Sequence, residues 1–370
     1  LQDQSAGRMN GARRGRGRLS VVRVQSSEFG VRKRGERKWE GEGAWSVGGR
    51  NLDYARAISP LPTPHQAPIS FHMPTRKYDL FAIDLDGTLL NSRGEVSPRN
   101  LAAIHSAREA GYRIVVCTGR GLKECRGYLD VIAQTDAVVV AGGSIIADPA
   151  TSRTIHRFSM DEDLVTQSVA CLHQQGHAAM VLKDPAGVGF DYLVVRGEKQ
   201  HKLDPIMDWW FDLMGVEVRY IDHMHEDAHP QHSVRIGALG ISTGIAAVAE
   251  RLKAIIGERG VMHHFPAVVG PDHVARLGPG EKFHILELFA AAGNKWSAVD
   301  WLAARDGIDP RRIVAIGDEI NDVSMITHAG LGVAMGNAIH QVRDVADKVT
   351  LGHNEDGFAI AVERVISGAW

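Results

Sequence analysis

Two carboxylates lie two residues apart directly after an apolar segment of the chain. The stretch Tyr78–Asn91 reads YDLFAIDLDGTLLN, and Asp84 and Asp86 follow the apolar residues 80–83. Acids this close raise each other's pKa unless a cation lies between them. Because ionised oxygens at the end of a strand suit a hard cation such as Mg²⁺, the spacing favours a magnesium site. A strand followed by an ordinary Asp-Gly turn is the alternative that this motif alone leaves open.

A second apolar segment, far along the chain, also ends in acids. Arg312–Gly317 (RIVAIG) predicts a buried strand. The acids after it and the first pair would repel one another strongly without a cation, and a bound Mg²⁺ together with Lys295 resolves that conflict. Lys295 stands at the predicted start of a helix, where the helix dipole disfavours a cation. A nearby anion would account for its position, and an exposed lysine without a functional role is the alternative. The polar residues after this strand are Asp318, Glu319, Asn321 and Asp322.

A phosphate-binding motif is the third candidate. The segment Tyr112–Cys117 (YRIVVC) predicts a buried strand that runs directly into Thr118, Gly119 and Arg120. A hydroxyl and an exposed backbone N–H at a strand end can bind a phosphate. An ordinary Thr-Gly turn is the alternative for this tripeptide.

These motifs need a sheet that brings them together. We predict a helix over Val96–Arg108, with Ser97 as its N-cap and Pro98 at its first position, and a third strand over Ala137–Ala141. The resulting β-α-β-α-β order implies a parallel sheet with right-handed crossovers. The carboxyl ends of its strands share one edge, so the polar loops after them, including the tight turn GGS at 142–144, converge there.

The character of the sequence changes between about Ile146 and Phe283. A stretch of about 135 residues of mixed helix and strand, flanked by sheet units, predicts a second domain inserted into the first. Its helices are predicted at Val165–Gln175 and Gly244–Ile256, and its strands at Ala178–Leu182, Phe190–Val195, Ser233–Leu239, Val261–Phe265 and His273–Leu277.

Two segments of the insertion are unusual in composition. Residues 222–232 (DHMHEDAHPQH) are rich in histidine, a frequent transition-metal ligand. No spacing there matches HExxH or a zinc motif, so we expect a polar loop rather than a metal site. Residues 208–211 (DWWF) predict a hydrophobic anchor of the inserted domain, with contact to a substrate as the alternative.

The overall composition is that of a globular protein. Hydrophobic residues make up 44% and charged residues 23% of the 370 residues. No segment approaches the roughly 18 uninterrupted apolar residues of a membrane span. Three cysteines without a CxxC motif predict neither a disulfide framework nor a structural zinc site, and a cytoplasmic location is expected.

The N-terminal tail differs from the rest in charge. Residues 1–72 contain 13 Lys or Arg and 6 Asp or Glu, a balance of +7, whereas the remainder balances at −9. The tail interleaves glycine and has no sustained periodicity, so we predict that residues 1–74 are disordered. Because Met73 stands just before the first predicted strand, we further hypothesise that the residues before it lie outside the native product.

In their order along the chain, these motifs resemble those of the haloacid dehalogenase superfamily of phosphatases. They are DLDGT, CTGR, the lysine at a helix start and GDEINDVSMI; the later GVAMGNA and NEDGFA, with the long insertion, resemble its Cof-type branch with a C2-type cap. The resemblance runs from Arg76 to the C-terminus. It implies an α/β, Rossmann-like parallel-sheet core at 75–147 and 284–370, with an inserted α+β cap domain at 148–283. The GGS turn replaces the Asn-Gly-Ala of many relatives, and Glu319 replaces their Asn or Ser.

The resemblance also implies roles for single residues. Asp84 would be the nucleophile that forms an aspartyl-phosphate, Asp86 the general acid and then the base, and Lys295 the cation that neutralises the phosphate and Asp84. These roles agree with the chemistry of phosphoryl transfer, in which charge on the transferring group needs cationic stabilisation. Thr118, Gly119 and Asn321 would bind the substrate phosphate; Asp84, the Asp86 carbonyl and Asp318 would bind Mg²⁺; and Asp322 would support the metal ligands.

We therefore expect a Mg²⁺-dependent phosphomonoester hydrolase that acts on a small phosphorylated metabolite, with sugar phosphates as the leading class. The alternatives are a phosphosugar mutase with the same nucleophile, and a phosphatase for a nucleotide, flavin or pyridoxal phosphate. A regulator that binds phosphosugars without catalysis has no need of the full set of acids and lysine. We expect no membrane partner, no nucleic-acid partner beyond what the basic tail allows, and a monomer or a homodimer.

Overall fold

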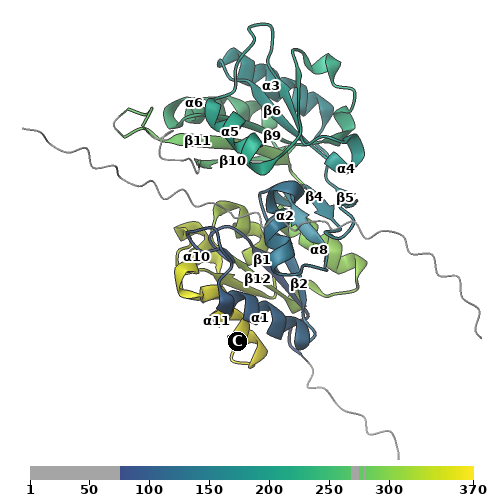
Figure 1. The fold of residues 1–370 in the computed structure, drawn as a ribbon, viewed down its shortest axis with the longest axis vertical. Helices are drawn as coiled ribbons and strands as arrows, with labels where there is room; N and C mark the ends of the chain where they lie inside the picture. Colours follow the sequence, from purple (N-terminus) through teal and green to yellow (C-terminus); the bar gives the residue numbers. More distant parts are fainter. Residues whose placement is uncertain (1–75, 268–274, 279) are drawn as a thin grey trace, which may run out of the picture. The chain divides into compact units, whose positions relative to one another are not determined.

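The computed structural model describes residues 76–267, 275–278 and 280–370. These residues form two β-sheets with helices packed against them (Figure 1). The tail predicted to be disordered, residues 1–74, lies outside the described residues, and so do His273 and Val274 of one predicted strand.

The first sheet has eight strands and confirms the predicted α/β class. Its order is β14-β13-β12-β1-β2-β3-β4-β5, and pairing is parallel from β14 to β3 and antiparallel from β3 to β5. The strands are β1 (Leu80–Asp84), β2 (Arg113–Cys117), β3 (Val138–Val140), β4 (Ile145–Ala147), β5 (Thr154–Arg157), β12 (Ile313–Gly317), β13 (Leu331–Ala334) and β14 (Lys348–Val349).

The strand order reverses at β1. From β1 the chain proceeds outward through β2 and β3 on one side, whereas β12, β13 and β14 extend the sheet on the other side. In open α/β sheets, ligands bind outside the carboxyl ends of the strands where the order reverses. Asp84 is the last residue of β1 and Asp318 follows β12, so both lie at this point.

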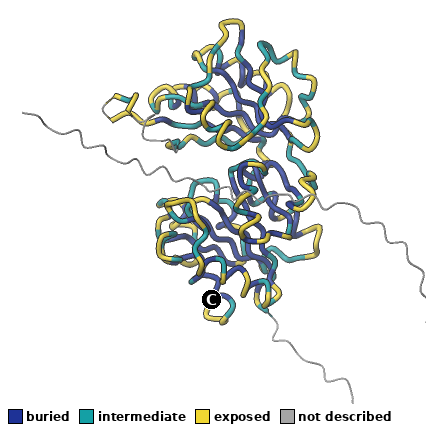
Figure 2. Tube along the Cα trace, viewed as in Figure 1, coloured by how far each residue is buried: buried dark blue, intermediate teal, exposed yellow. Residues whose placement is uncertain are grey.

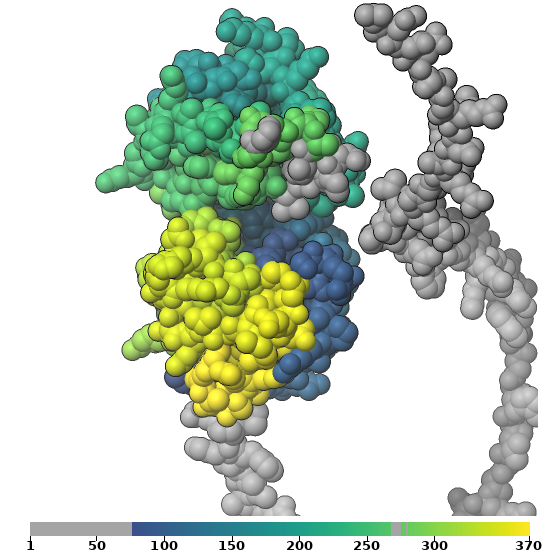
Figure 3. Space-filling model, turned by 90° about the vertical axis from the view of Figure 1, so that its left-hand side faces the viewer, coloured from purple at the N-terminus to yellow at the C-terminus, as the bar shows by residue number. Residues whose placement is uncertain are grey.

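Helices α1 (Pro98–Glu109) and α11 (Gly357–Ile366) lie side by side at one face of the first sheet, where the C-terminal part of the chain meets the N-terminal part (Figures 1 and 3). Ser97 is the N-cap of α1, as predicted, and its hydroxyl accepts a hydrogen bond from the backbone N–H of Asn100 at 3.1 Å. Arg99 and Glu363 join the two helices by an ion pair of 2.9 Å. The other helices of this part are α2 (Leu122–Val131), α8 (Lys295–Arg305), α9 (Val323–His328) and α10 (His340–Val345).

The second sheet has six strands in the order β10-β11-β9-β6-β7-β8, antiparallel except for the pair β7 and β8. Helices α3 and α6 pack on each other and on its central strands, and the buried segments follow these strands (Figure 2). The elements are α3 (Glu162–Gln174), β6 (Ala179–Lys183), α4 (Pro185–Val188), β7 (Tyr192–Val195), α5 (Pro205–Met214), β8 (Val218–Ile221), β9 (Ser233–Ile241), α6 (Ser242–Ile256), β10 (Gly260–Pro266) and β11 (Phe283–Ala290).

The two faces of the second sheet differ in their side chains. Leu286 and Leu288 of β11 join the apolar cluster formed with α3 and α6, so Glu287 between them points to the opposite face. By the same alternation, Ile236 of β9 faces the helices and Arg235 faces away from them. Glu287 and Arg235 therefore lie on the face opposite α3 and α6.

The sheets do not divide at the predicted domain boundaries of 147/148 and 283/284. β5 extends the first sheet beyond residue 148, and β11 pairs with β9 and β10 of the second sheet although it begins at Phe283. A division by sheet membership would fall near Ser159 and Ala290, and the inserted domain itself stays a prediction. The pairing with β9 that assigns β11 to the second sheet joins segments far apart in the chain.

Residues 275–277 form a turn and a bend, so the strand predicted over His273–Leu277 is wrong in its described part. Among the helices of residues 76–267, 275–278 and 280–370, none is long and apolar enough to cross a membrane.

Candidate active site

A buried ion pair joins the two halves of the chain at the carboxyl end of β1. Lys295, the first residue of α8, donates from Nζ to Asp84 Oδ1 at 2.5 Å and to Asp322 Oδ1 at 2.7 Å. Lys295 and Asp322 are fully buried, and Asp84 is 5% exposed. The structure thus brings together three residues whose roles were predicted from separate motifs.

Burial and charge act in opposite directions on this group. Burial raises the pKa of Asp84 well above its usual range, and Lys295 partly offsets this. Burial alone would lower the pKa of Lys295, but Asp322 and Asp84 outweigh it and raise that pKa. The lysine therefore remains charged between the two carboxylates.

Asp318 completes the cluster of carboxylates. Its Oδ1 accepts a hydrogen bond from the Thr88 hydroxyl at 3.0 Å, and its Oδ2 accepts one from Asn337 Nδ2 at 3.0 Å. Burial, followed by the charge of Asp322, raises the pKa of Asp318 to about 7. Asn337 also donates to the carbonyl oxygen of Gly87 at 2.9 Å, so it connects the loop after β1 to the loop after β12.

Gly87 is required where these loops meet. Its φ is +77°, and a Cβ at this position would lie 2.2 Å from Asp318 Oδ2. A side chain would therefore be strained by the backbone conformation and would displace a carboxylate of the site.

The donor set fits a hard divalent cation. Oxygen atoms of Asp84, Asp318 and Asp322 all lie within 4.8 Å of one another, the one group of possible metal ligands found among the described residues. With only Lys295 to balance them, three ionised carboxylates leave a net charge of −2, and all-oxygen ligands suit Mg²⁺. Both oxygens of Asp322 are already occupied, Oδ1 by Lys295 and Oδ2 by the backbone N–H groups of residues 318 and 319 at 3.0 Å. The Asp318 oxygens also accept hydrogen bonds, but from the neutral side chains of Thr88 and Asn337 rather than from a cation. Asp84 and Asp318 are therefore better placed than Asp322 to bind the metal directly.

Asp86 points to a different partner. Arg120 donates to both of its oxygens, from Nε at 2.8 Å and from Nη2 at 2.6 Å. The Asp86 side chain is 51% exposed, and the arginine lies over the rings of Tyr128 and Trp210 at 5.2 and 5.8 Å. An acid–base role for Asp86 requires its carboxyl group to leave this bidentate pair or to share it with a substrate.

The loop after β2 lies next to the loop after β12. Thr118 is fully buried, and its hydroxyl accepts a hydrogen bond from the backbone N–H of Arg120 at 3.1 Å. Asn321 lies beside this loop, since a Cβ placed on Gly119 would be 3.8 Å from Asn321 Nδ2. Asn321 Oδ1 is buried and has no hydrogen-bond partner within the described part of the chain. Such an orphaned polar atom is costly unless a ligand satisfies it.

The GGS turn at 142–144 approaches protein rather than a ligand. Gly143 has φ of +109°, and a Cβ there would lie 2.0 Å from the carbonyl carbon of Asn294. The turn is buried against the N-terminus of α8. Its glycines therefore allow the backbone that carries Lys295 to come close to the first sheet.

The histidine-rich loop 222–232 closes on buried ionic groups. Lys183 and Asp227 form an ion pair in which both side chains are almost completely buried, and Lys183 also donates to the carbonyl oxygen of His229 at 3.2 Å. His232 lies 3.9 Å from Asp184. No cluster of possible metal ligands involves this loop within the described residues.

The DWWF segment lies in α5 and shows the predicted anchor. Phe211 is buried and packs on Tyr192 with ring centroids 4.9 Å apart. Trp210 additionally reaches Arg120 of the loop after β2, a contact between distant segments that the composition did not indicate.

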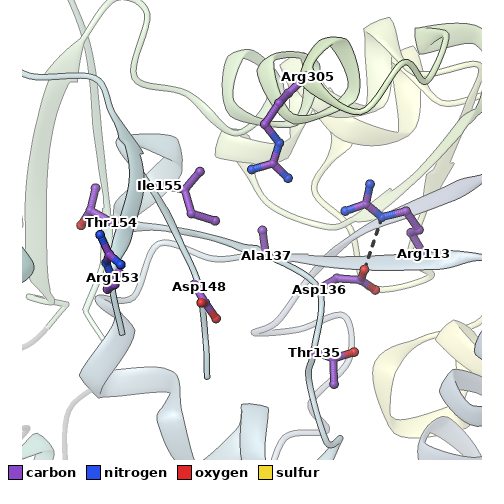
Figure 4. A pocket seen from close by; sticks show the side chains of 9 residues that line it. All are labelled: Arg113, Thr135, Asp136, Ala137, Asp148, Arg153, Thr154, Ile155 and Arg305. Carbon is purple, nitrogen blue, oxygen red and sulfur yellow. Dashed lines mark hydrogen bonds and ion pairs between the residues drawn. The ribbon is translucent and has the colours of Figure 1, made fainter. Parts of the chain in front are cut away.

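A pocket of about 530 Å³ lies at the opposite edge of the first sheet, at the amino ends of β2, β3 and β5 (Figure 4). Arg113 pairs there with Asp136 and with Asp306, and Arg305 pairs with Asp306. Because its charges largely neutralise one another and the carboxylate cluster is at the other edge, we place the candidate active site at Asp84 and not in this pocket.

Some residues of the site were not given a role from the sequence. Thr88 and Asn337 belong to the DGT and GNA segments quoted above, so a signal was present. Arg120 stands in the CTGR segment, but nothing local indicates that it pairs with Asp86. Arg235 of the second sheet carries no sequence signal at all, and only the fold brings it to the loop after β2.

Comparison with known proteins agrees with this geometry. The family described as haloacid dehalogenase-like hydrolase matches residues 81–225 and 271–362, more than half of the chain. The chain belongs to this family. The predicted resemblance is thereby confirmed, as is the prediction that the protein is an enzyme of the phosphatase type.

Several relatives match almost over their whole length. Phosphatase YwpJ of Bacillus subtilis is 28% identical over 301 residues, which cover 78% of this chain and 99% of that protein. The 5-amino-6-(5-phospho-D-ribitylamino)uracil phosphatase YwtE of Bacillus subtilis is 27% identical over 302 residues, covering 78% and 98%. The crystal structure of a haloacid dehalogenase-like hydrolase from Bacteroides thetaiotaomicron has a TM-score of 0.61 and 25% identity, and covers 78% of this chain and all of that one.

Proposed function

We propose that this protein is a Mg²⁺-dependent phosphomonoester hydrolase that works through an aspartyl-phosphate on Asp84. The observation that carries the proposal is the Lys295–Asp84 contact of 2.5 Å beside Asp318, at the point where the strand order of the sheet reverses. Lys295 favours the ionised form of Asp84 against the effect of burial, and an ionised carboxylate is suited to attack an electrophilic phosphorus atom. When bound at Asp84 and Asp318, Mg²⁺ would supply charge neutralisation for the phosphoryl group.

The remaining residues have distinct roles in this proposal. The Thr118 hydroxyl, the Gly119 N–H and the Asn321 Nδ2 group donate hydrogen bonds to the phosphoryl oxygens, and the unsatisfied Oδ1 of Asn321 is left to accept from a substrate hydroxyl or from water. Asp86 protonates the leaving oxygen and then takes a proton from the attacking water, with Arg120 controlling its position. Asp322 orients Lys295 and the backbone of Asp318.

The proposed substrate is a small phosphorylated metabolite, with phosphorylated sugars or sugar alcohols as the leading class. YwtE, one of the relatives whose names specify a substrate, is named for a compound with a phosphorylated ribityl chain, while YbhA of Escherichia coli is named for pyridoxal phosphate. That likeness supports the class and does not select a member of it.

The test is phosphate release by the purified chain with Mg²⁺, over a panel of phosphorylated sugars, sugar alcohols, nucleotides and cofactors. Asp84→Asn should lower turnover at least 10³-fold because it removes the nucleophile, an effect of about 4 kcal/mol or more. Asp227→Asn is the matched control, since it also alters a buried aspartate paired with a lysine, but in the second sheet. Residual activity of Asp84→Asn near that of wild type would refute the assignment.

A further inference from the structure

We propose that Arg235 of the second sheet is a positioning residue for the phosphate-binding hydroxyl of Thr118. The inference rests on the proposed function, because Thr118 is taken to bind the phosphoryl group. It concerns a residue in β9 that lies 116 positions from the loop it contacts.

The guanidinium of Arg235 reaches the loop after β2 directly. Its Nη1 donates to the carbonyl oxygen of Gly119 at 2.8 Å, and the same atom lies 2.7 Å from Glu287 Oε1. Arg235 is 6% exposed and Glu287 is 7% exposed. The charge of the arginine is thus balanced by a carboxylate of its own sheet, while its hydrogen bond is directed to the other sheet's loop.

The peptide unit between Gly119 and Arg120 is held at both ends. Its carbonyl oxygen accepts from Arg235, and its N–H donates to the Thr118 hydroxyl oxygen at 3.1 Å. A hydroxyl has one hydrogen to donate and lone pairs to accept. Because the backbone N–H occupies an acceptor position of Thr118, the hydroxyl hydrogen is left for another acceptor, such as a phosphoryl oxygen. A rotation of this peptide unit would move the Arg120 N–H away from the Thr118 oxygen, and the hydroxyl hydrogen would no longer be directed toward the phosphoryl group.

Arg235 reaches the same loop by a second route. Its Nη2 donates to the Tyr192 hydroxyl at 2.7 Å, which donates to Glu124 Oε1 at 3.0 Å. The other oxygen of Glu124 accepts from the backbone N–H of Gly121 at 2.7 Å. One guanidinium therefore fixes the loop at residue 119 and, through two buried side chains, at residue 121.

The burial of this network strengthens its hydrogen bonds between the second sheet and the loop after β2. Glu287 and Arg235 lie on the face of the second sheet opposite α3 and α6, and the four residues of the network (Arg235, Glu287, Tyr192 and Glu124) are each at most 7% exposed. Hydrogen bonds excluded from water are stronger and better aligned than exposed ones. The second sheet thereby contributes to phosphate binding without touching the phosphate.

The principal test removes both members of the buried pair, so that neither charge is left alone. In the full chain, we expect Arg235→Gln/Glu287→Gln to weaken the binding of inorganic phosphate, measured by calorimetry with Mg²⁺, about tenfold, the effect of one misaligned hydrogen bond to a charged group. The control is Lys183→Gln/Asp227→Asn, which removes a comparable buried pair from the same sheet. It should leave phosphate affinity within about twofold of wild type. Tyr192→Phe, which removes only the second route, should give an intermediate loss.

A double-mutant cycle separates positioning from a general loss of structure. In a Thr118→Ala background, Arg235→Gln/Glu287→Gln should change phosphate affinity less than about twofold, because the hydroxyl it positions is gone. Equal losses in both backgrounds, or a double variant that binds phosphate as tightly as wild type, would overturn the proposal.

The proposed function fails separately. A wild-type chain that binds phosphate but hydrolyses no member of the substrate panel would refute the hydrolase, while the affinities would still decide the role of Arg235. A wild-type chain that binds no phosphate would refute both.

Discussion

Replacing Lys295 by methionine tests the electrostatic reasoning most directly. The substitution keeps most of the side-chain volume and removes the cation that contacts both Asp84 and Asp322. Breaking a buried pair from one side costs about 3–5 kcal/mol, because the remaining charge has no partner. Since whole domains are stable by only about 5–15 kcal/mol, we expect a marked fall in the free energy of unfolding.

The same change should reduce catalysis. Without Lys295, the pKa of Asp84, already raised by burial, rises further, so that less of the ionised nucleophile is present. The loss of a buried cation beside the phosphoryl group should cost a further factor of about 10²–10³ in kcat.

The stability of the protein should also depend on pH. A carboxyl group whose pKa is raised in the folded state binds a proton more tightly there than in the unfolded chain, where its pKa is about 3.9. Its stabilising contribution is therefore present at low pH and is lost as pH rises through the folded-state pKa. In the presence of a chelator, Lys295→Met should be destabilised relative to wild type more at pH 8 than at pH 5.

Urea denaturation at both pH values and steady-state kinetics with Mg²⁺ are the assays. Lys183→Met is the control, since Lys183 is also fully buried and paired with an aspartate, but lies in the second sheet. It should lose stability and keep kcat. The reasoning is refuted if Lys295→Met retains kcat within tenfold of wild type and loses the same stability at pH 5 and pH 8.

Three further predictions concern the metal, the backbone and a distant ion pair. Chelation should stop hydrolysis, Mg²⁺ should restore it, and activity that persists in excess chelator would contradict the proposed metal site. Gly87→Ala should lower both Mg²⁺ affinity and turnover and cost about 1–3 kcal/mol of stability, because its Cβ would meet Asp318. The control is Gly94→Ala, since Gly94 also has a positive φ, of +71°, but a Cβ there would have no atom closer than 3.6 Å. This control should show only the stability cost of the backbone conformation. The pKa of Asp306 is lowered to about 2 by hydrogen bonds from Arg305 and then Arg113. Asp306→Asn should therefore lower the free energy of unfolding by about 1 kcal/mol at pH 7. In urea titrations, this difference between variant and wild type should disappear as pH falls from 4 to 2.

Much of the first sheet could be predicted from the sequence because its signals are local. The buried runs before Asp84 and before Asp318 read as strands, and Ser97 followed by Pro98 marked the start of α1 within the ordinary uncertainty of helix ends. The second sheet was harder to predict, since several of its strand pairs join segments far apart in the chain. β11 was missed because the run FHILELFA is assigned to a sheet only by its pairing with β9 and β10.

The sequence by itself determined which residue types are available and the order of the strands that carry them. Acids after two apolar strands, with a lysine at a helix start, predicted a cation site at the edge of a parallel sheet, and the resemblance carried by the ordered motifs implied phosphoryl transfer there. Only the tertiary structure decided which charges meet. Lys295 contacts Asp84 across 211 residues, Asp86 turns to Arg120, and Arg235 reaches the Gly119 carbonyl from another sheet. The physical reason is that the sequence around a charged residue does not indicate which opposite charge it will pair with. The partner is set by the tertiary packing, which brings the two groups together and excludes water around them.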